Sequence, residues 1–304
     1  ESYGAALAEL GDKYNIIVLD ADLSKSTKTE VFKKKFPDRF INMGIAEANM
    51  MSTAAGLASC GKIVFASSFA MFAAGRAFEQ IRNSICYPCL NVKIGATHAG
   101  ISGGEDGATH QCLEDIGIMR TLPNMIVINP ADDTEAKAAV KAAVEHDGPV
   151  YLRFGRLGVP VLFDDNYNFE IGKGVTLKEG TDVTLVATGL LVGTALDAAE
   201  LLKNEGINAR VINIHTIKPI DRDIIAKAAK ETGAIVTCEE HNIIGGLGSA
   251  VAETVAETCP VPVLRVGTED VFGKSGKPNE LFEAYGLTAE NIVSKAKKAM
   301  ELKK

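Results

Sequence analysis

Short apolar runs alternate with amphipathic segments along the first half of this 304-residue chain. The runs are rich in Val and Ile and predict buried strands at residues 15–22, 39–44, 62–67, 91–97, 125–131 and 149–155. The segments between them have helical spacing and predict helices at residues 1–14, 46–59, 72–85 and 132–146. Strands that alternate with helices in this way predict a mostly parallel sheet with helices on both faces.

The alternation is interrupted once, at residues 157–174, where Pro, Asn and Gly indicate a linker or crossing segment. It resumes with strands predicted at residues 182–189, 207–217, 233–240 and 261–267, and the chain ends in a lysine-rich helix. The predicted fold class is therefore α/β, with two doubly wound, mostly parallel sheets. We expect two domains, residues 1–165 and 166–304.

Composition narrows the functional classes. The net charge of −7 argues against a nucleic-acid or anionic-membrane surface, because both need clustered basic charge. No apolar run is long enough to span a membrane, and the first residues resemble a helix rather than a signal peptide, so we expect a cytoplasmic protein. The six cysteines show no disulfide or metal framework, which fits a reducing compartment. Cys86 and Cys89 have redox spacing, but a lone pair of this kind favours buried or helix-end thiols.

The segment from Gly95 to Gln111, GATHAGISGGEDGATHQ, is the strongest candidate for an active-site loop. It leaves a predicted buried strand, and loops that follow strand ends are where open α/β sheets bind ligands. Its glycines allow the backbone to approach a ligand closely, with His98, Asp106 and His110 placed around it. An imidazole near neutral pH can donate a hydrogen bond or transfer a proton.

Glu47 is the second candidate, at the start of the predicted helix 46–59. A carboxylate at a helix N-terminus has an ordinary explanation, because it is stabilised by the helix dipole. Its apolar neighbours, such as Ile45 and Met50, would also desolvate it, and burial can raise the pKa of a carboxyl by about 3–5 units. The residues alone leave capping and catalysis equally open.

Two segments, RFINMGIAEANM and SSFAMFAAGRAFEQIR, resemble the pyrimidine-binding domain of the transketolase family of thiamine-diphosphate enzymes. The resemblance implies that Glu47 is catalytic and hydrogen-bonds the aminopyrimidine ring of thiamine diphosphate. It also implies that Phe69 and Phe72 form an aromatic wall beside that ring. Without the resemblance, the i, i+3 spacing of these two phenylalanines favours an ordinary helix core.

The same resemblance gives roles to the glycine-rich loop. It implies that His98 binds the substrate phosphate and that Asp106 hydrogen-bonds a hydroxyl of the donor. His110 is implied to be catalytic, orienting the carbonyl or hydroxyls of the sugar. The substrates implied are phosphorylated sugars, which exchange a two-carbon ketol unit.

Two further segments complete the implied site. In DADLSKST, Asp22 matches an acid on the cofactor side and Ser26 a phosphate contact. In YLRFGRLGVP, Arg156 matches an arginine whose planar fork suits a terminal phosphate. Arg153 is more typical of a structural ion pair.

The second half, with EEHNIIGGLGSAVAE, resembles the transketolase C-terminal domain, which is mainly structural. His241 and the turn Gly245–Gly248 are expected to end a strand and begin a helix there. Residues 1–165 would then be the pyrimidine-binding domain and residues 166–304 the C-terminal domain.

One part of the family pattern has no match here. The diphosphate-binding domain carries a Gly-Asp-Gly motif and an Asn that hold Mg²⁺, and nothing in this sequence resembles it. The chain is therefore expected to be the C-terminal subunit of a split transketolase, whose N-terminal subunit holds Mg²⁺ and the diphosphate, in a dimer of heterodimers. A fragment of a longer enzyme, a deoxyxylulose-phosphate synthase-like or 2-oxo acid dehydrogenase β-like subunit, and a non-catalytic binding homologue are the alternatives.

Overall fold

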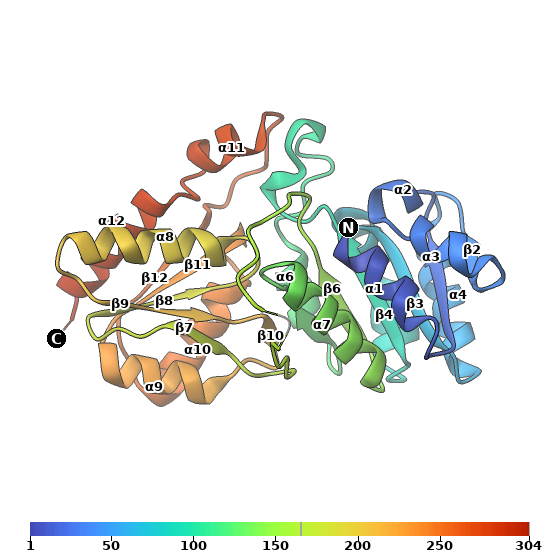
Figure 1. Ribbon diagram of the computed structural model, residues 1–304, viewed down its shortest axis with the longest axis horizontal. Coiled ribbons are helices and arrows are strands. Elements are labelled where there is room, and N and C mark those ends of the chain that lie inside the picture. The colour runs from blue at the N-terminus through green and yellow to red at the C-terminus, as the bar shows by residue number, and fades with distance from the viewer. Residues whose placement is uncertain (165, 304) are drawn as a thin grey trace.

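A seven-stranded sheet forms the centre of the first half of the computed structural model, which describes residues 1–164 and 166–303 (Figure 1). Its order is β10-β5-β6-β4-β3-β1-β2, and every neighbouring pair except β10 with β5 is parallel. The first six strands are β1 (Ile16–Asp20), β2 (Phe40–Asn42), β3 (Ile63–Phe69), β4 (Val92–Thr97), β5 (Ile126–Ile128) and β6 (Val150–Arg153). Five of them lie within a run that predicted a strand, and β3 extends two residues beyond the predicted run 62–67.

Helices cover both faces of this sheet. One face packs against α1 (Ser2–Leu10), α3 (Glu30–Lys35) and α7 (Asp133–Glu145), through buried residues such as Leu7 and Val140. The other face packs against α4 (Glu47–Ser59) and α6 (Asp115–Arg120), where Met50 and Met51 are fully buried. Short elements complete the half: α2 (Ser24–Thr27), η1 (Pro37–Arg39), η2 (Met71–Arg76), α5 (Phe78–Gln80), η3 (Ile81–Cys86) and η4 (Ile101–Asp106).

The second half contains a five-stranded sheet of order β12-β11-β8-β9-β7. Its strands are β7 (Val175–Lys178), β8 (Val183–Ala187), β9 (Ala209–Asn213), β11 (Ile235–Asn242) and β12 (Val263–Thr268), and only β7 is antiparallel. Helices α8 (Leu191–Asn204) and α12 (Ala289–Glu301) lie above it in Figure 1, with α9 (Arg222–Thr232) and α10 (Leu247–Thr258) below. Helix α11 (Pro278–Ala284) lies near η4 of the first half. The prediction of two doubly wound α/β sheets is confirmed.

One strand from the second half of the sequence joins the sheet of the first half. The predicted strand 207–217 is wrong as a single element: it ends at Asn213, and β10 (Thr216–Lys218) then pairs antiparallel with β5 of the first sheet. The apolar run was continuous in sequence, so nothing local marked the change of sheet. The predicted domain boundary at residue 165 falls on a residue outside those described.

A buried carboxylate also links the halves. Glu135, on α7, accepts hydrogen bonds from the Tyr167 hydroxyl (2.6 Å), the Asn213 amide (2.8 Å) and the Ala131 N–H (2.6 Å). Asn213 ends β9 of the second sheet, so the contact spans the junction. Burial raises the pKa of Glu135 to about 7, although the three donors act in the opposite direction.

The predicted helix 72–85 differs most from its expected form. It is two π-helical turns, η2 and η3, that flank the single α-helical turn α5. A π turn contains one more residue than an α turn, and apolar periodicity over 14 residues does not distinguish them. Cys86 ends η3 and is buried, whereas Cys89 is exposed, which fits the prediction of helix-end thiols. Within the described residues, no helix is long and apolar enough to cross a membrane.

Candidate active site

A cleft of about 620 Å³ lies at the carboxyl ends of the central strands of the first sheet. Ser26, His98 and Arg156 all line it, although 130 positions of sequence separate the first from the last. They arrive on α2, on the loop after β4 and on the segment after β6. Parallel strands bring their carboxyl ends to one edge of the sheet, which is why these distant residues meet.

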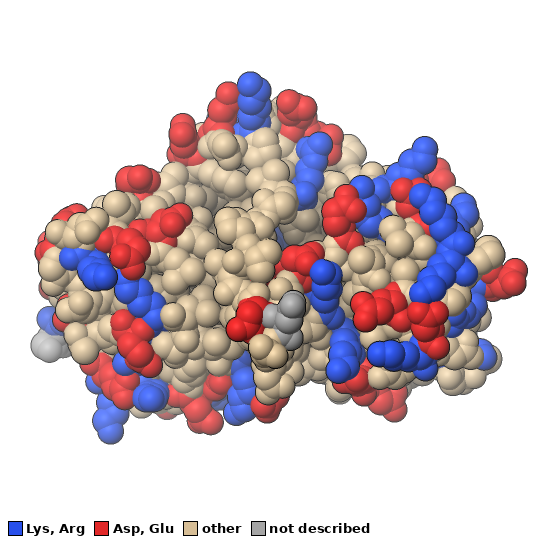
Figure 2. All heavy atoms as spheres, in the orientation of Figure 1, with Lys and Arg blue, Asp and Glu red and all other residues tan. Residues whose placement is uncertain are grey.

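The cleft has further cationic residues. Lys25 and Lys28 line it together with the three predicted residues, and the Lys28 ammonium lies 2.9 Å from the carboxylate of Glu1. Lys and Arg side chains gather over α2 and α3, at the right of Figure 2. A lysine in a short polar segment has no distinguishing pattern, so neither cleft lysine is predicted from sequence. Glu1, Asp132, Asp133 and Glu240 also line the cleft, so its cations offer local contacts to an anionic ligand rather than a uniformly positive surface.

His98 is held in an unusual backbone conformation, with φ at +57°. Its Nδ1 lies 3.0 Å from the Thr97 hydroxyl. Burial lowers the pKa of His98 to about 4, and the neighbouring Arg156 lowers it further while Asp106 opposes the change. The imidazole is therefore neutral at physiological pH and acts as a hydrogen-bonding group rather than as a cation.

An aromatic group adjoins the cleft and shares His98 with it. The Phe69 ring stacks on the His98 imidazole at 4.0 Å and lies 5.9 Å from the ring of Phe72. Phe72 meets His110 edge to face at 5.3 Å. The helix-core alternative for the two phenylalanines is wrong, because Phe69 ends β3 and Phe72 lies in η2.

Glu47 begins α4, is 4% exposed and lies beside the fully buried Met50, as expected, but a cation also contacts it. Its Oε1 lies 3.1 Å from Nη1 of Arg76, whose guanidinium sits 4.1 Å from the centre of the Phe72 ring. Ile45, expected to desolvate the carboxylate, is 76% exposed. Arg76 is thus a site residue that the sequence did not predict, although it is the one cation among the small and apolar residues of η2.

Other predicted residues lie outside the cleft lining. Asp22 has a φ of +64° and accepts a hydrogen bond from the amide of Asn42 at 2.9 Å, beside the edge strand β2. Asp106 is exposed at the end of η4 and acts on His98 through its charge. His110 directs Nδ1 to the Thr109 hydroxyl at 2.9 Å. The structure therefore forms a cleft group and an aromatic group, joined at His98.

A fully buried hydrogen-bond network around Arg153 lies next to the cleft. The Arg153 guanidinium donates to the Asp115 carboxylate at 2.9 Å, and the Tyr151 hydroxyl donates to the same oxygen at 2.8 Å. Arg153 also donates to the backbone carbonyl of Glu240 at 2.9 Å. Arg153 forms a structural ion pair, as predicted, and reaches both halves of the chain.

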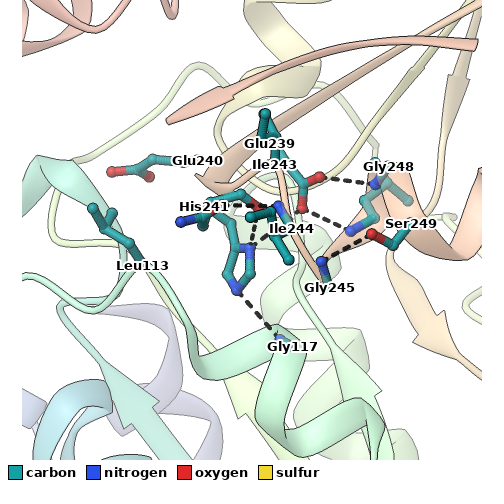
Figure 3. A network of polar contacts seen from close by, with 12 residues as sticks. Leu113, Gly117, Glu239, Glu240, His241, Ile243, Ile244, Gly245, Gly248 and Ser249 are labelled. Carbon is teal, nitrogen blue, oxygen red and sulfur yellow. Dashed lines mark hydrogen bonds and ion pairs between the residues drawn. The ribbon is translucent and has the colours of Figure 1, made fainter. Parts of the chain in front are cut away.

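The end of β11 forms a second network, drawn in Figure 3. The Gly117 N–H donates to Nε2 of His241 at 3.3 Å, and Nδ1 of His241 lies 2.6 Å from the Asn242 carbonyl. Nε2 as acceptor and Nδ1 as donor to the Asn242 carbonyl tie His241 to both halves of the chain, so it is a structural group. The strand then turns through Gly245 into α10, which agrees with the prediction for this segment.

Among residues 1–164 and 166–303, no group of three or more His, Cys, Asp or Glu side chains could hold a metal ion.

The chain matches known domains along most of its length. The transketolase pyrimidine-binding domain matches residues 1–160, and the transketolase C-terminal domain matches residues 172–292. A candidate transketolase C-terminal section from Methanocaldococcus jannaschii is 54% identical over 99% of this chain and 95% of its own length. A 6-deoxy-6-sulfo-D-fructose transketolase subunit from a Clostridium species is 44% identical over 100% of this chain and 94% of its own length.

Solved structures agree with these matches. A structure described as a split gene transketolase, in the form of an inactive β4 tetramer, is 58% identical, with a TM-score of 0.94. The match covers 100% of this chain and 98% of that one.

Full-length relatives are about twice as long. Human transketolase is 40% identical over 96% of this chain, which spans only 47% of the human protein.

Proposed function

Because this chain belongs to the transketolase family, we propose that it is the C-terminal subunit of a split transketolase that transfers a two-carbon ketol unit between sugar phosphates. The observation that carries the proposal is the convergence of Ser26, His98 and Arg156 on one cleft, beside the aromatic group of Phe69 and Phe72. A protein needed only for assembly would not require an anion-binding cleft and an aromatic site that share one imidazole.

The residues present fit the ring end of thiamine diphosphate. Glu47 supplies a buried carboxylate acceptor, and Phe69 and Phe72 supply apolar ring faces, which suit a flat aminopyrimidine. In this structure the Arg76 guanidinium pairs with the Glu47 carboxylate and covers the face of the Phe72 ring. It must therefore move when a cofactor ring binds there. When bound, thiamine diphosphate supplies the nucleophilic carbon for ketol transfer, and the protein contributes orientation and electrostatics.

The cleft residues are proposed to bind the anionic end of the substrate. The Arg156 guanidinium and the Lys25 and Lys28 ammonium groups supply charge, while the neutral His98 and the Ser26 hydroxyl supply directional hydrogen bonds. A phosphate and a sulfonate are both compatible with this set. A substrate screen with ketose phosphates and a sulfonated ketose distinguishes them.

His110 of the aromatic group, together with Asp106 and Asp22, is proposed to act at the end of the substrate where the ketol unit is transferred. His110 has Nδ1 committed to Thr109, so its Nε2 is available to orient or protonate a sugar oxygen. Asp106, exposed at the end of the loop, is proposed to accept a hydrogen bond from a donor hydroxyl. Asp22 is proposed to approach the cofactor side only once its contact with Asn42 is replaced.

A second polypeptide is proposed to complete the site. The family's diphosphate end needs Mg²⁺ ligands, and the described residues offer no cluster that could hold a metal ion. The relatives named as a subunit and as a split gene product support an N-terminal partner subunit, assembled with this chain as a dimer of heterodimers. The six unpaired cysteines support a cytoplasmic location.

Calorimetry tests the proposal directly. The chain alone, titrated with thiamine diphosphate and Mg²⁺, should bind weakly, because burying one ring offers little after the cost of immobilising the cofactor is subtracted. Addition of the N-terminal subunit should create cofactor binding and ketol transfer together, saturating at a one-to-one ratio of chains. Tight binding with turnover by the chain alone would overturn the split-enzyme proposal.

A further inference from the structure

We propose that Glu240, a residue of the C-terminal domain, is a positioning residue for the anionic end of the substrate. It holds the turn at Ser102, and the next residue, Gly103, orients Arg156. The substrate part of this inference rests on the proposed function. The positioning part rests only on contacts within the chain.

Glu240 reaches out of its own domain into the glycine-rich loop. Its side chain comes from β11, is 2% exposed and lines the cleft. Its Oε1 accepts a hydrogen bond from the Ser102 N–H at 2.5 Å. The approach requires glycine at position 100, where φ is +84° and a Cβ atom would lie 2.3 Å from the Glu240 carboxyl carbon.

The held turn leads directly to Arg156. The carbonyl of Gly103, one residue beyond Ser102, accepts a hydrogen bond from Nη1 of Arg156 at 2.7 Å. The Arg156 side chain is otherwise exposed to solvent, so the hydrogen bond to the Gly103 carbonyl is what orients its guanidinium. A displaced turn would release the guanidinium, and ligand binding would then have to order a flexible side chain.

A second side chain holds the same turn from the other side. The amide of Gln111 donates to the carbonyls of Ile101 (3.2 Å), Gly104 (3.1 Å) and Lys274 (2.9 Å). Lys274 belongs to the C-terminal domain. The loop is therefore fixed to that domain at two places, by Glu240 and through the Lys274 carbonyl.

Burial of the Glu240 carboxylate is costly, which argues for a specific role. Burial raises its pKa, while the Arg153 guanidinium and the Ser102 N–H act in the opposite direction. An apolar side chain of similar volume would avoid that cost, since buried charges often stabilise less than apolar packing does. What an apolar residue cannot do is accept the Ser102 hydrogen bond.

Glu239 provides a matched control one residue away. Figure 3 shows the two side chains pointing in different directions from β11. Glu239 is also fully buried, but it accepts hydrogen bonds from the N–H groups of Leu247 (2.7 Å) and Gly248 (2.8 Å), which begin α10. Its loss should weaken the fold without releasing the substrate loop.

The test compares Glu240→Leu and Glu240→Gln with Glu239→Gln, each assembled with the N-terminal subunit. Glu240→Leu keeps the bulk and loses the acceptor, so KM for a ketose phosphate donor should rise by about tenfold. KM for hydroxypyruvate, which lacks the phosphate, and kcat should change by less than about twofold. Glu240→Gln retains an acceptor oxygen and should restore KM to within about threefold. Glu239→Gln should lower thermal stability and leave both KM values unchanged.

Hydrogen exchange on the full chain without a partner gives a readout independent of activity. The Ser102 amide should exchange at least about tenfold faster in Glu240→Leu, and at the wild-type rate in Glu239→Gln. An equal rise of KM for both donors, or unchanged exchange at Ser102 in Glu240→Leu, would overturn the positioning role. Should that variant fail to fold, Glu240→Gln decides the same point, because its neutral amide oxygen is a weaker acceptor than the carboxylate: the Ser102 amide should exchange about threefold faster than in Glu239→Gln, and equal rates would overturn the role. Absence of ketol transfer in the wild-type pair would overturn the proposed function instead and leave the exchange result intact.

Discussion

The buried carboxyl of Glu135 should make the stability of this protein decrease as the pH rises toward 8. In the folded chain burial raises its pKa to about 7, against an ordinary value of 4.5. A carboxyl of this kind favours folding fully below the unfolded pKa, and that contribution is lost as the pH rises through the folded pKa. The affected pH window is therefore about 4.5 to 7.

The magnitude follows from the size of the shift. A rise from 4.5 to about 7 corresponds to about 3 kcal/mol of unfolding free energy, at 1.36 kcal/mol for each pH unit. About 2 kcal/mol of this total is lost as the pH rises from about 5.5 to about 8. Glu135 is fully buried, so solvent screening does not reduce the figure in the way it does for surface groups.

The assay is urea unfolding of wild type and Glu135→Gln, followed by far-ultraviolet circular dichroism because the chain has no tryptophan. The variant cannot ionise at this position, so the wild type should lose about 2 kcal/mol relative to it across that pH range. Glu145→Gln, at the exposed end of the same helix, sets the baseline. A constant difference between wild type and Glu135→Gln at every pH would refute the reasoning.

Three further outcomes are expected. In the assembled enzyme, Glu47→Gln should leave the fold intact and slow hydrogen–deuterium exchange at the thiazolium carbon of bound cofactor by about 10²–10⁴-fold; a wild-type rate removes Glu47 from the mechanism. Arg156→Ala should raise KM for phosphorylated donors by about 10–100-fold with a smaller effect on kcat, whereas an equal rise for hydroxypyruvate contradicts phosphate binding. Asp115→Ala should lower the unfolding free energy in urea by about 3–5 kcal/mol, because it strands the buried Arg153 and Tyr151 groups; a loss below about 1 kcal/mol would show that the network is dispensable.

The elements that sequence predicted well are those whose local pattern and tertiary role agree. The strand run 15–22 contains β1, and the acidic first turn of the helix 132–146 contains the observed N-cap, where Asp132 accepts from the Glu135 N–H. β10 was missed because it continues the apolar run of β9 and differs only in the sheet that it joins. The π turns were missed because their extra residue leaves the apolar spacing nearly unchanged.

Some residues of the candidate site could be predicted from local pattern, and others could not. Ser26, His98 and Arg156 follow three strand ends, so a parallel sheet brings them together without further information. The partners of the charged groups were not predictable in this way. Arg76 lies 29 residues from Glu47, and Glu240 lies 138 residues from Ser102. Neither separation leaves a periodic or local signal, and only the packing of elements creates the contact.

The apolar neighbours of Glu47 give this division a functional meaning. Sequence predicted a desolvated carboxylate, and Glu47 is 4% exposed beside the fully buried Met50. Ile45, however, is 76% exposed, and the Arg76 side chain is 53% exposed in the isolated chain. The carboxylate is therefore buried as predicted, but Ile45 faces solvent and the cation of Arg76 lies against the carboxylate. In the proposed assembly a second subunit covers that surface, and the cofactor ring displaces Arg76 from Glu47. The apolar environment that the sequence encodes around Glu47 would then be completed only in the complex, which is the physical reason to expect cofactor binding and activity to appear together.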